Sequence, residues 1–178
     1  MPGRTPGRTM MFALGLSVAV VGIGWVSAQQ RTRPPTLTAE DYMDIQQLYS
    51  NYVRACDMGG GGDGSNYVAN FTDDGEFGDS GGRVNKGPAA LKRMIKGFHD
   101  GLKKNGWSSR HTYSGLLITP TAEGAKGSVY ALIFNVTAKP PFVDHSGVYE
   151  DWLVKTPSGW KFKKRIFKPS GAFQPSLP

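Results

Sequence analysis

The sequence predicts one α+β domain, in which a curved antiparallel β-sheet is covered by N-terminal α-helices and encloses a pocket. Two amphipathic segments, 38–57 and 88–104, come first, and everything after Trp107 has the pattern of β-strands. Helices followed by a long antiparallel meander are typical of α+β domains. An antiparallel sheet with one open apolar face needs a cover, and the two helices can supply it.

The N-terminal segment 1–28 has the features of a secretory signal peptide. Arg4 and Arg8 precede an uncharged run over residues 10–26, and small residues follow up to Ala28. A positive start, an apolar stretch and a small-residue cleavage site mark such leaders. We therefore expect an exported protein, periplasmic or secreted. The alternative is an uncleaved membrane anchor, although the apolar run is short for crossing a bilayer.

After the leader, we expect a flexible linker over 29–36, one domain over 37–170 and a C-terminal tail over 171–178. The linker is rich in glutamine, arginine and proline, a composition without an apolar face to bury. A chain of 178 residues has room for one domain with a targeting segment.

The basic charge of the chain does not predict a nucleic-acid-binding protein. The formal net charge of +7 falls to +5 without residues 1–28, which hold two arginines and no acidic residue. The basic residues are scattered or alternate along apparent strands, as at Lys161 and Lys163, and no RNA- or DNA-binding motif accompanies them. A solvated sheet face explains them.

The first helix is predicted from Thr38, with Asp41 at N3 as in a capping box and Leu37 placed as a hydrophobic staple. Its apolar face follows helical spacing and comprises Ile45, Leu48, Tyr49, Tyr52, Val53 and Cys56. Because Cys56 is the only cysteine and lies on this face, we expect a buried structural thiol and no disulfide. The helix should end before the glycine run 58–62, which predicts irregular structure.

The middle of the chain predicts a helical turn over 66–71, a turn at 73–75 and a short strand near Glu76-Phe77. Pro88 at the first helical position indicates the start of the second helix, and Lys104-Asn105-Gly106 its end. The strands that follow are expected at 110–119, 127–139, 147–156 and 160–168.

Polar residues on apolar faces are the candidates for function, because burying them costs free energy unless they are paired or used. Asp57 lies at the C-terminal end of the first helix, where the helix dipole disfavours an anion. It is a candidate general base or partner of a histidine or arginine; the alternative is a cap for the glycine run. Tyr52, predicted to point inward, is either a pocket residue or core, and Tyr49 is a weaker candidate on the same face.

His111 opens the first long strand, and histidine is the commonest proton carrier near neutral pH. Tyr113, two residues on, is a candidate for substrate binding. His99 and His145 lie on a helix flank and in a loop, and the three histidines do not have metal-ligand spacing. We therefore expect neither a metal nor a cofactor.

Asn135 and Arg165 are the remaining candidates for substrate binding. Asn135 continues the face of Val129 and Ala131, and its amide could bind a substrate oxygen or orient His111. Both faces of that strand are apolar, so the pattern leaves open which one looks inward. Arg165 is either a surface residue, which the alternation of its strand favours, or a charge that closes one end of the pocket enclosed by the sheet.

The order of several short motifs resembles the SnoaL-like branch of the nuclear transport factor 2 (NTF2-like) superfamily over residues 37–168. The motifs are Cys56-Asp57, Asn-Phe-Thr-Asp-Asp-Gly at 70–75, Gly87 to Leu91, Arg110-His111, Gly147 to Asp151 and Gly159 to Arg165. The resemblance implies the NTF2-like cone. It also implies proton abstraction and transfer by Tyr52, Asp57 and His111, and substrate contact by Asn135. Arg165 occupies the usual basic position near the end.

The expected function is that of a cofactor-independent lyase (dehydratase) or isomerase acting on a small apolar molecule. One imidazole, one carboxylate, one phenol and one amide among apolar walls suit proton transfer on a neutral substrate. Two alternatives remain open: a non-catalytic carrier of a hydrophobic ligand, and a protein-interaction module that uses the outer sheet face. The resemblance also implies a homodimer.

Overall fold

The computed structural model describes Gly3 and residues 35–57 and 62–171. Residues 35–57 and 62–171 belong to one compact unit, which is described below. The expected signal peptide, residues 29–34 of the expected linker, most of the glycine run 58–62 and residues 172–178 lie outside the described residues and stay predictions. Among the residues that are described, no helix has the length and hydropathy needed to span a membrane.

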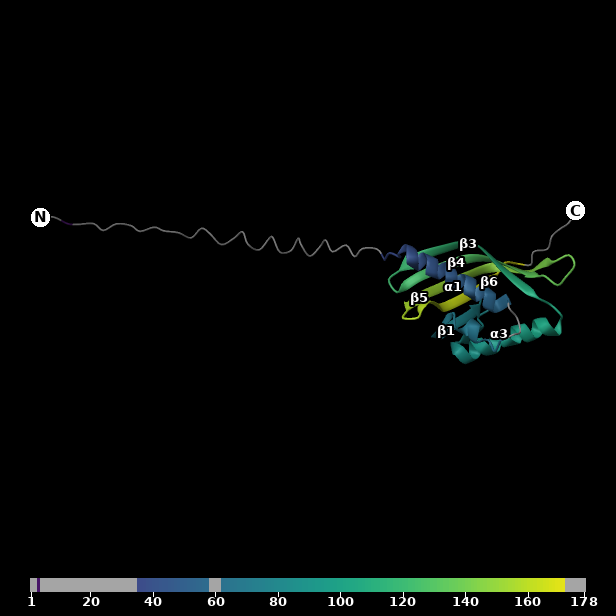
Figure 1. Cartoon of the computed structure of the whole chain (residues 1–178). Coiled ribbons are helices and arrows are strands. Elements are labelled where there is room, and N and C mark those ends of the chain that lie inside the picture. The colour runs from purple at the N-terminus through teal and green to yellow at the C-terminus, as the bar shows by residue number, and fades with distance from the viewer. Residues whose placement is uncertain (1–2, 4–34, 58–61, 172–178) are drawn as a thin grey trace. The chain divides into compact units, whose positions relative to one another are not determined.

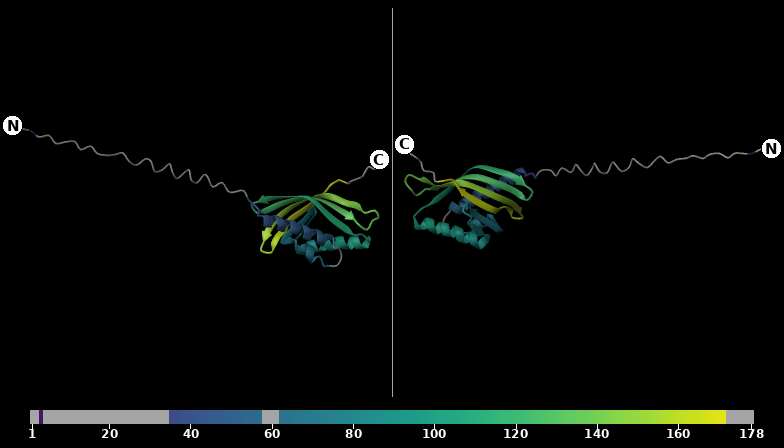
Figure 2. Two further views of the ribbon diagram at one scale, coloured as in Figure 1. Left: turned by 45° about the horizontal axis from the view of Figure 1, so that its top comes forward. Right: turned by 180° about the vertical axis from the view of Figure 1, so that it is seen from behind.

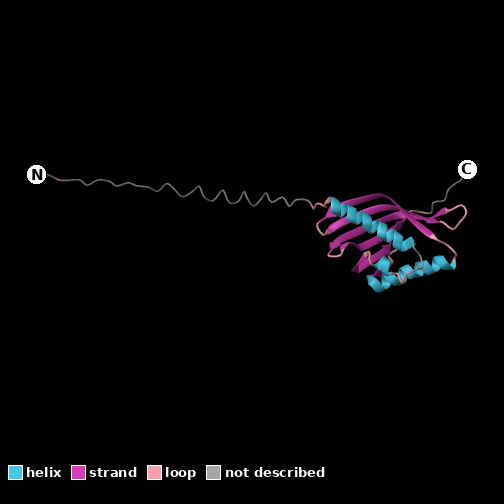
Figure 3. Ribbon diagram, viewed as in Figure 1, coloured by secondary structure: helices cyan, strands magenta, loops and turns pink. Residues whose placement is uncertain are grey.

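The domain has three helices and six strands in the described residues, in the order shown in Figures 1 and 3. The helices are α1 (Ala39–Asp57), α2 (Ser65–Val68) and α3 (Gly87–Lys104). The strands are β1 (Phe71–Asp79), β2 (Val84–Lys86), β3 (Ser109–Thr121), β4 (Gly124–Asn135), β5 (Phe142–Thr156) and β6 (Gly159–Pro169).

The strands form one curved sheet in the order β2-β1-β6-β5-β4-β3, and the helices lie on one side of it (Figure 2). The meander β3 to β6 is antiparallel, as predicted. The sheet is nevertheless mixed, because β1 runs parallel to β6. β2 was not predicted, because its three residues are too few to form a recognisable pattern.

Several predicted boundaries differ from the structure; for example, β4 begins at Gly124 rather than at residue 127. Residues 73–75, expected as a turn, lie inside β1, where the register shifts between Phe71 and Glu76. β4 ends at Asn135 rather than at Lys139, because the chain turns there, and β5 begins earlier, at Phe142. In each case a polar or proline-containing stretch interrupted the hydrophobic pattern, so the pattern did not mark where the strand begins or ends.

The N-terminus of α1 has the predicted capping box. The Asp41 backbone N–H donates to the Thr38 hydroxyl (3.1 Å), and the Thr38 backbone N–H donates to Asp41 Oδ2 (2.9 Å). Asp41 Oδ1 also accepts from Lys155 Nζ (2.8 Å) and Trp160 Nε1 (3.0 Å). Hydrogen bonds from Lys155, Thr38 and Trp160 lower the pKa of Asp41. The cap therefore also fixes α1 to the β5–β6 hairpin.

The inner face of α1 packs against the sheet as predicted, and Cys56 is buried among the core residues. The question of which face of β4 looks inward is settled by burial: Val129 is 1% exposed and Tyr130 63%. Tyr49 reaches across the core to the backbone of β4, where a Cβ on Gly127 would overlap its hydroxyl. Gly127 is therefore required by the close approach of a helix side chain to the sheet.

Replacing Thr38 with alanine should lower the free energy of unfolding by about 1 kcal/mol, because the Asp41 amide loses its capping acceptor. Thr38→Ser keeps the hydroxyl and should cost much less. Chemical denaturation of both variants measures the difference. Equal stability of Thr38→Ala and Thr38→Ser would show that the cap contributes nothing.

Gly127→Ala should destabilise the domain by about 1–3 kcal/mol, because the new methyl group meets the Tyr49 hydroxyl inside a packed core. Adding Tyr49→Phe removes that hydroxyl, so the double variant should lose less than the sum of the two single losses. Gly97→Ala, on α3 with open space around it, is the matched control and should not destabilise. Additive losses in the double variant would contradict the contact.

Candidate functional site

A groove of about 690 Å³ lies between α1 and the edge strand β3. Its walls come from α1 residues about one turn apart and from β3 residues 110–116. Its apolar wall is formed by Val53, Leu116 and Val129, and its polar residues include Gln46, Ser50, Arg54, Thr112 and Ser114. Four of the predicted site residues line it: Tyr49, Asp57, His111 and Tyr113.

Asp57 and His111 form a buried pair at one end of this groove. His111 Nδ1 lies 2.6 Å from Asp57 Oδ1, and the His111 backbone N–H donates to both carboxylate oxygens (3.1 and 2.9 Å). The side chains are 5% (His111) and 9% (Asp57) exposed. These hydrogen bonds explain why a carboxylate is stable at the C-terminus of a helix, where the dipole opposes it.

The pairing also assigns the protons of the imidazole. An ionised carboxylate only accepts, so Nδ1 of neutral His111 carries the hydrogen and Nε2 keeps a free lone pair. Phe98 of α3 lies edge-on to the ring, with centroids 6.3 Å apart. The imidazole thus has a fixed orientation beside an apolar neighbour, and its free nitrogen can accept a proton.

The other two histidines have different surroundings. Nε2 of His99 lies 2.9 Å from the Cys56 carbonyl oxygen, which ties α3 to the last turn of α1. His145 pairs with Asp144 on the surface. No cluster of three or more potential metal ligands occurs in the described part of the chain.

Arg165 is fully buried, and the expectation of a surface position was wrong. Leu153 pairs with Phe162 and Trp152 with Lys164, so Lys163 is left over as a bulge. The extra residue reverses the alternation of β6, and Arg165 turns inward together with Phe162. A bulge of one residue moves every later side chain of a strand to the other face.

The Arg165 guanidinium lies in a cage of aromatic rings, 4.0 Å from the centroids of Tyr52 and Tyr149 and 4.4 Å from that of Phe162. Its partner is Asp151, directly opposite on β5, with Nε 3.5 Å from Oδ1 and both side chains 0% exposed. Burial raises the pKa of Asp151 to about 6, against the opposing effects of Arg165 and Tyr49. Two opposite charges buried this deeply are stable only as a pair, because either one alone would be left uncompensated in the core.

Tyr52 and Asn135 do not line the groove. The Tyr52 hydroxyl lies 3.1 Å from that of Tyr67, and its ring stacks on Arg165, so it belongs to the core. Asn135 Oδ1 accepts from the Thr137 backbone N–H (3.1 Å) and hydroxyl (2.8 Å), which closes the turn after β4. Asp57, and not Asn135, orients His111.

Three residues around the buried arginine were not predicted: Asp151 and Tyr149, which contact it, and Tyr67, which contacts Tyr52. Tyr149 and Asp151 alternate with Leu153 on the inner face of β5, and this period of two was a signal that could have placed the carboxylate inside. An inward carboxylate on one strand predicts an inward cation on its neighbour. Tyr67, on a helix of four residues, gave no such signal.

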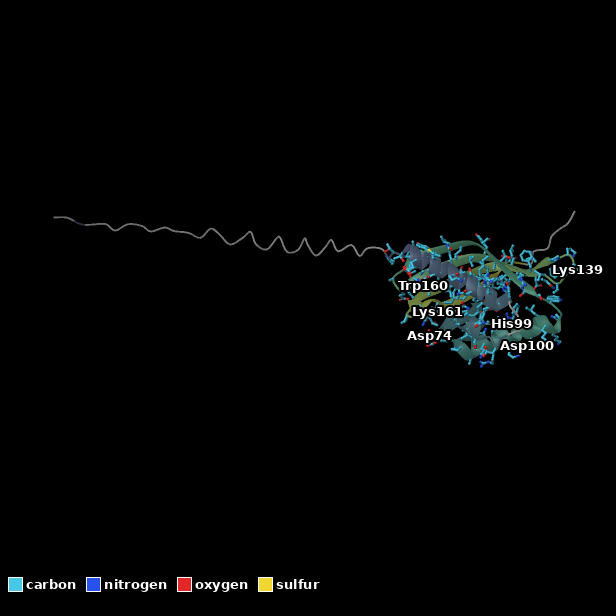
Figure 4. All side chains as sticks on the ribbon, in the orientation of Figure 1. Asp74, His99, Asp100, Lys139, Trp160 and Lys161 are labelled. Atoms are coloured by element: carbon cyan, nitrogen blue, oxygen red, sulfur yellow. The ribbon has the colours of Figure 1, made fainter. Side chains whose placement is uncertain are left out.

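A second hollow, of about 750 Å³, lies beside α1 and α2 on a different side of the helix layer. Figure 4 labels three of its residues, His99, Trp160 and Lys161. Most of the residues that line it are of polar types, and neither Asp57 nor His111 belongs to it. The acid–base pair is therefore associated with the groove between α1 and β3.

Comparison with known proteins identifies the family. The model of the SnoaL-like domain matches residues 37–166. No curated protein matches the chain.

Solved structures share the fold at low sequence identity. An NTF2-like protein with a cystatin-like fold from Novosphingobium aromaticivorans is 23% identical (TM-score 0.65), over 75% of this chain and 85% of that one. ActVI-ORFA from Streptomyces coelicolor is 21% identical (TM-score 0.63), over 77% and 100%. A candidate scytalone dehydratase from N. aromaticivorans is 20% identical (TM-score 0.59), over 74% and 85%. With the family model spanning almost the whole folded unit, the chain belongs to the SnoaL-like domain family.

Proposed function

We propose that the protein binds a small, largely apolar molecule in the groove between α1 and β3 and transfers a proton on it. The observation that carries the proposal is the buried Asp57–His111 pair, which lines a groove with an apolar wall. A fixed imidazole with a carboxylate behind it is the arrangement of a general base. The fold is that of a candidate scytalone dehydratase, which supports a lyase or isomerase.

In the proposed reaction, Nε2 of His111 takes a proton from a carbon next to a carbonyl group. The electron pair of the broken C–H bond moves toward the carbonyl oxygen. In an isomerase the proton returns to another carbon, and in a dehydratase it leaves with a β-hydroxyl group as water. Asp57 stabilises the imidazolium that forms in between. The chemistry requires no cofactor.

The residues proposed to hold the substrate oxygen differ from those expected from the sequence. Tyr52 and Asn135 were expected to hold it, but their polar atoms are engaged in the core and in a turn. Tyr49 and Tyr113 line the groove instead and are the phenols that a bound molecule can meet.

A carrier without catalysis is the second candidate. It is favoured by the fact that three expected site residues, Tyr52, Asn135 and Arg165, serve the packing of the fold. A groove that keeps only one proton-transfer pair can bind an apolar molecule without changing it.

Export and dimerisation complete the proposal. The charge pattern and small residues of 1–28 support secretion. On the outer sheet face, Leu117, Tyr130 and Leu132 are 64%, 63% and 41% exposed. Apolar side chains gathered on one face support contact with a second copy of the domain or another protein.

Proton abstraction can be tested without knowing the substrate, by following deuterium exchange at the α-carbons of β-tetralone in D₂O by NMR. The protein should accelerate the exchange, and His111→Gln should reduce the acceleration by about 10²- to 10⁴-fold. Asp57→Asn should reduce it less, because the imidazole keeps a hydrogen-bond partner.

His145→Gln is the matched control, because that histidine is on the surface, and it should leave the exchange unchanged. Thermal shift with β-tetralone reports binding separately, since a ligand of the folded state raises the melting temperature. Binding without accelerated exchange would favour the carrier. Full exchange activity in folded His111→Gln would show that the imidazole is not the base.

A further inference from the structure

Two phenols line the groove, and the same buried ion pair touches both. Tyr49 comes from α1 and Tyr113 from β3, with ring centroids 6.2 Å apart. Behind them lie Asp151 and Arg165, both fully buried. Among the described residues, the two phenols are the only side chains that form hydrogen bonds with this ion pair.

The phenol of Tyr113 receives a hydrogen bond from the ion pair. Arg165 Nη2 donates to the Tyr113 hydroxyl oxygen at 3.3 Å. A guanidinium can only donate, so the phenol oxygen must accept and its own hydrogen must point elsewhere. Burial raises the pKa of Tyr113 well above its ordinary value, so the phenol keeps that hydrogen.

The phenol of Tyr49 has the opposite role. Its hydroxyl donates to Asp151 Oδ2. Burial, followed by the Asp151 charge, raises the pKa of Tyr49, so this proton also stays on the phenol. Because its hydrogen is already committed to the carboxylate, Tyr49 cannot donate to a molecule in the groove.

We propose that Arg165 is a positioning residue that makes Tyr113 the hydrogen-bond donor of the groove, so that a ligand is held by a carbonyl or enolate oxygen. Tyr113 touches the ligand, and Arg165 acts through it. The charge of the guanidinium polarises the phenol O–H and strengthens a bond to an oxygen that gains negative charge. His111 and Tyr113 lie two residues apart on β3 and so face the same side of the sheet.

This inference rests on the proposed function, since it names the ligand group that the groove selects. The Tyr149 hydroxyl is the other group that the Tyr113 hydroxyl can reach, and the centroids of the two rings are 5.6 Å apart. The Tyr149 hydroxyl also lies near Tyr52, so Tyr113 is not its only neighbouring phenol. Removing the Tyr149 hydroxyl is therefore a required control.

The test compares two ligands with the same skeleton, β-tetralone, which has a carbonyl oxygen, and tetralin, which has none. The wild-type protein should bind β-tetralone more tightly than tetralin by about three- to ten-fold, the effect of one hydrogen bond. Infrared spectroscopy of bound β-tetralone should show the carbonyl stretch at lower frequency than in an apolar solvent, because a donor lengthens the C=O bond.

Tyr113→Phe should abolish both the affinity ratio and the frequency shift. Tyr149→Phe is the matched control, because Tyr149 does not line the groove, and it should keep both. Arg165→Lys, which keeps a cation, should keep part of the frequency shift, and Arg165→Met should lose it. If the Arg165 variants do not fold, as circular dichroism would show, the comparison of Tyr113→Phe with Tyr149→Phe still decides.

The outcomes separate the two proposals. Equal binding of β-tetralone and tetralin by the wild-type protein would overturn the donor role of Tyr113 and leave an apolar groove. A frequency shift that persists in Tyr113→Phe, or that is lost in Tyr149→Phe, would do the same. If the wild-type protein bound neither molecule, the groove would not be a site for apolar ligands, and both proposals would be wrong.

Discussion

The buried ion pair between Asp151 and Arg165 is the constraint around which the domain is organised. The two residues face each other across β5 and β6 in the middle of the sheet, and aromatic rings enclose the guanidinium. Loss of one partner from such a pair costs about 3–5 kcal/mol, since the other charge is left uncompensated in the core. The helix layer, the tyrosine cluster and the register of β6 all have to satisfy this pair.

The ion pair also separates structural from functional polar groups. Tyr52 packs over the arginine on the core side, and its hydroxyl meets that of Tyr67. Tyr49 and Tyr113 contact the same charges from the groove side. One buried ion pair can therefore stabilise the fold and also set the polarity of a binding surface, because the two phenols that contact it line the groove. Asp57 and His111 at the groove's end are independent of it in their hydrogen bonds.

The periodic parts of the sequence predicted the fold well. The stripe of α1, its capping box and the four strands of the meander follow from spacing and local chemistry. The pairing of Asp57 with His111 was foreseen as one option because a carboxylate at a helix C-terminus needed an explanation. Arg165 was misplaced because a bulge at Lys163 has no local signature. Asn135 was misassigned because an inward amide on a strand looks the same whether it meets a ligand or closes a turn.

The hydrogen bonds of Asp57 have a second effect, on the border of the sheet. β3 is the last strand on its side, and unpaired backbone groups there can recruit a foreign strand. The backbone N–H of His111 is already taken by a carboxylate from α1. Asp57, which holds the imidazole, therefore also occupies one backbone donor of the edge strand. That donor is not available to pair with an added strand, which disfavours self-association through this edge of the sheet.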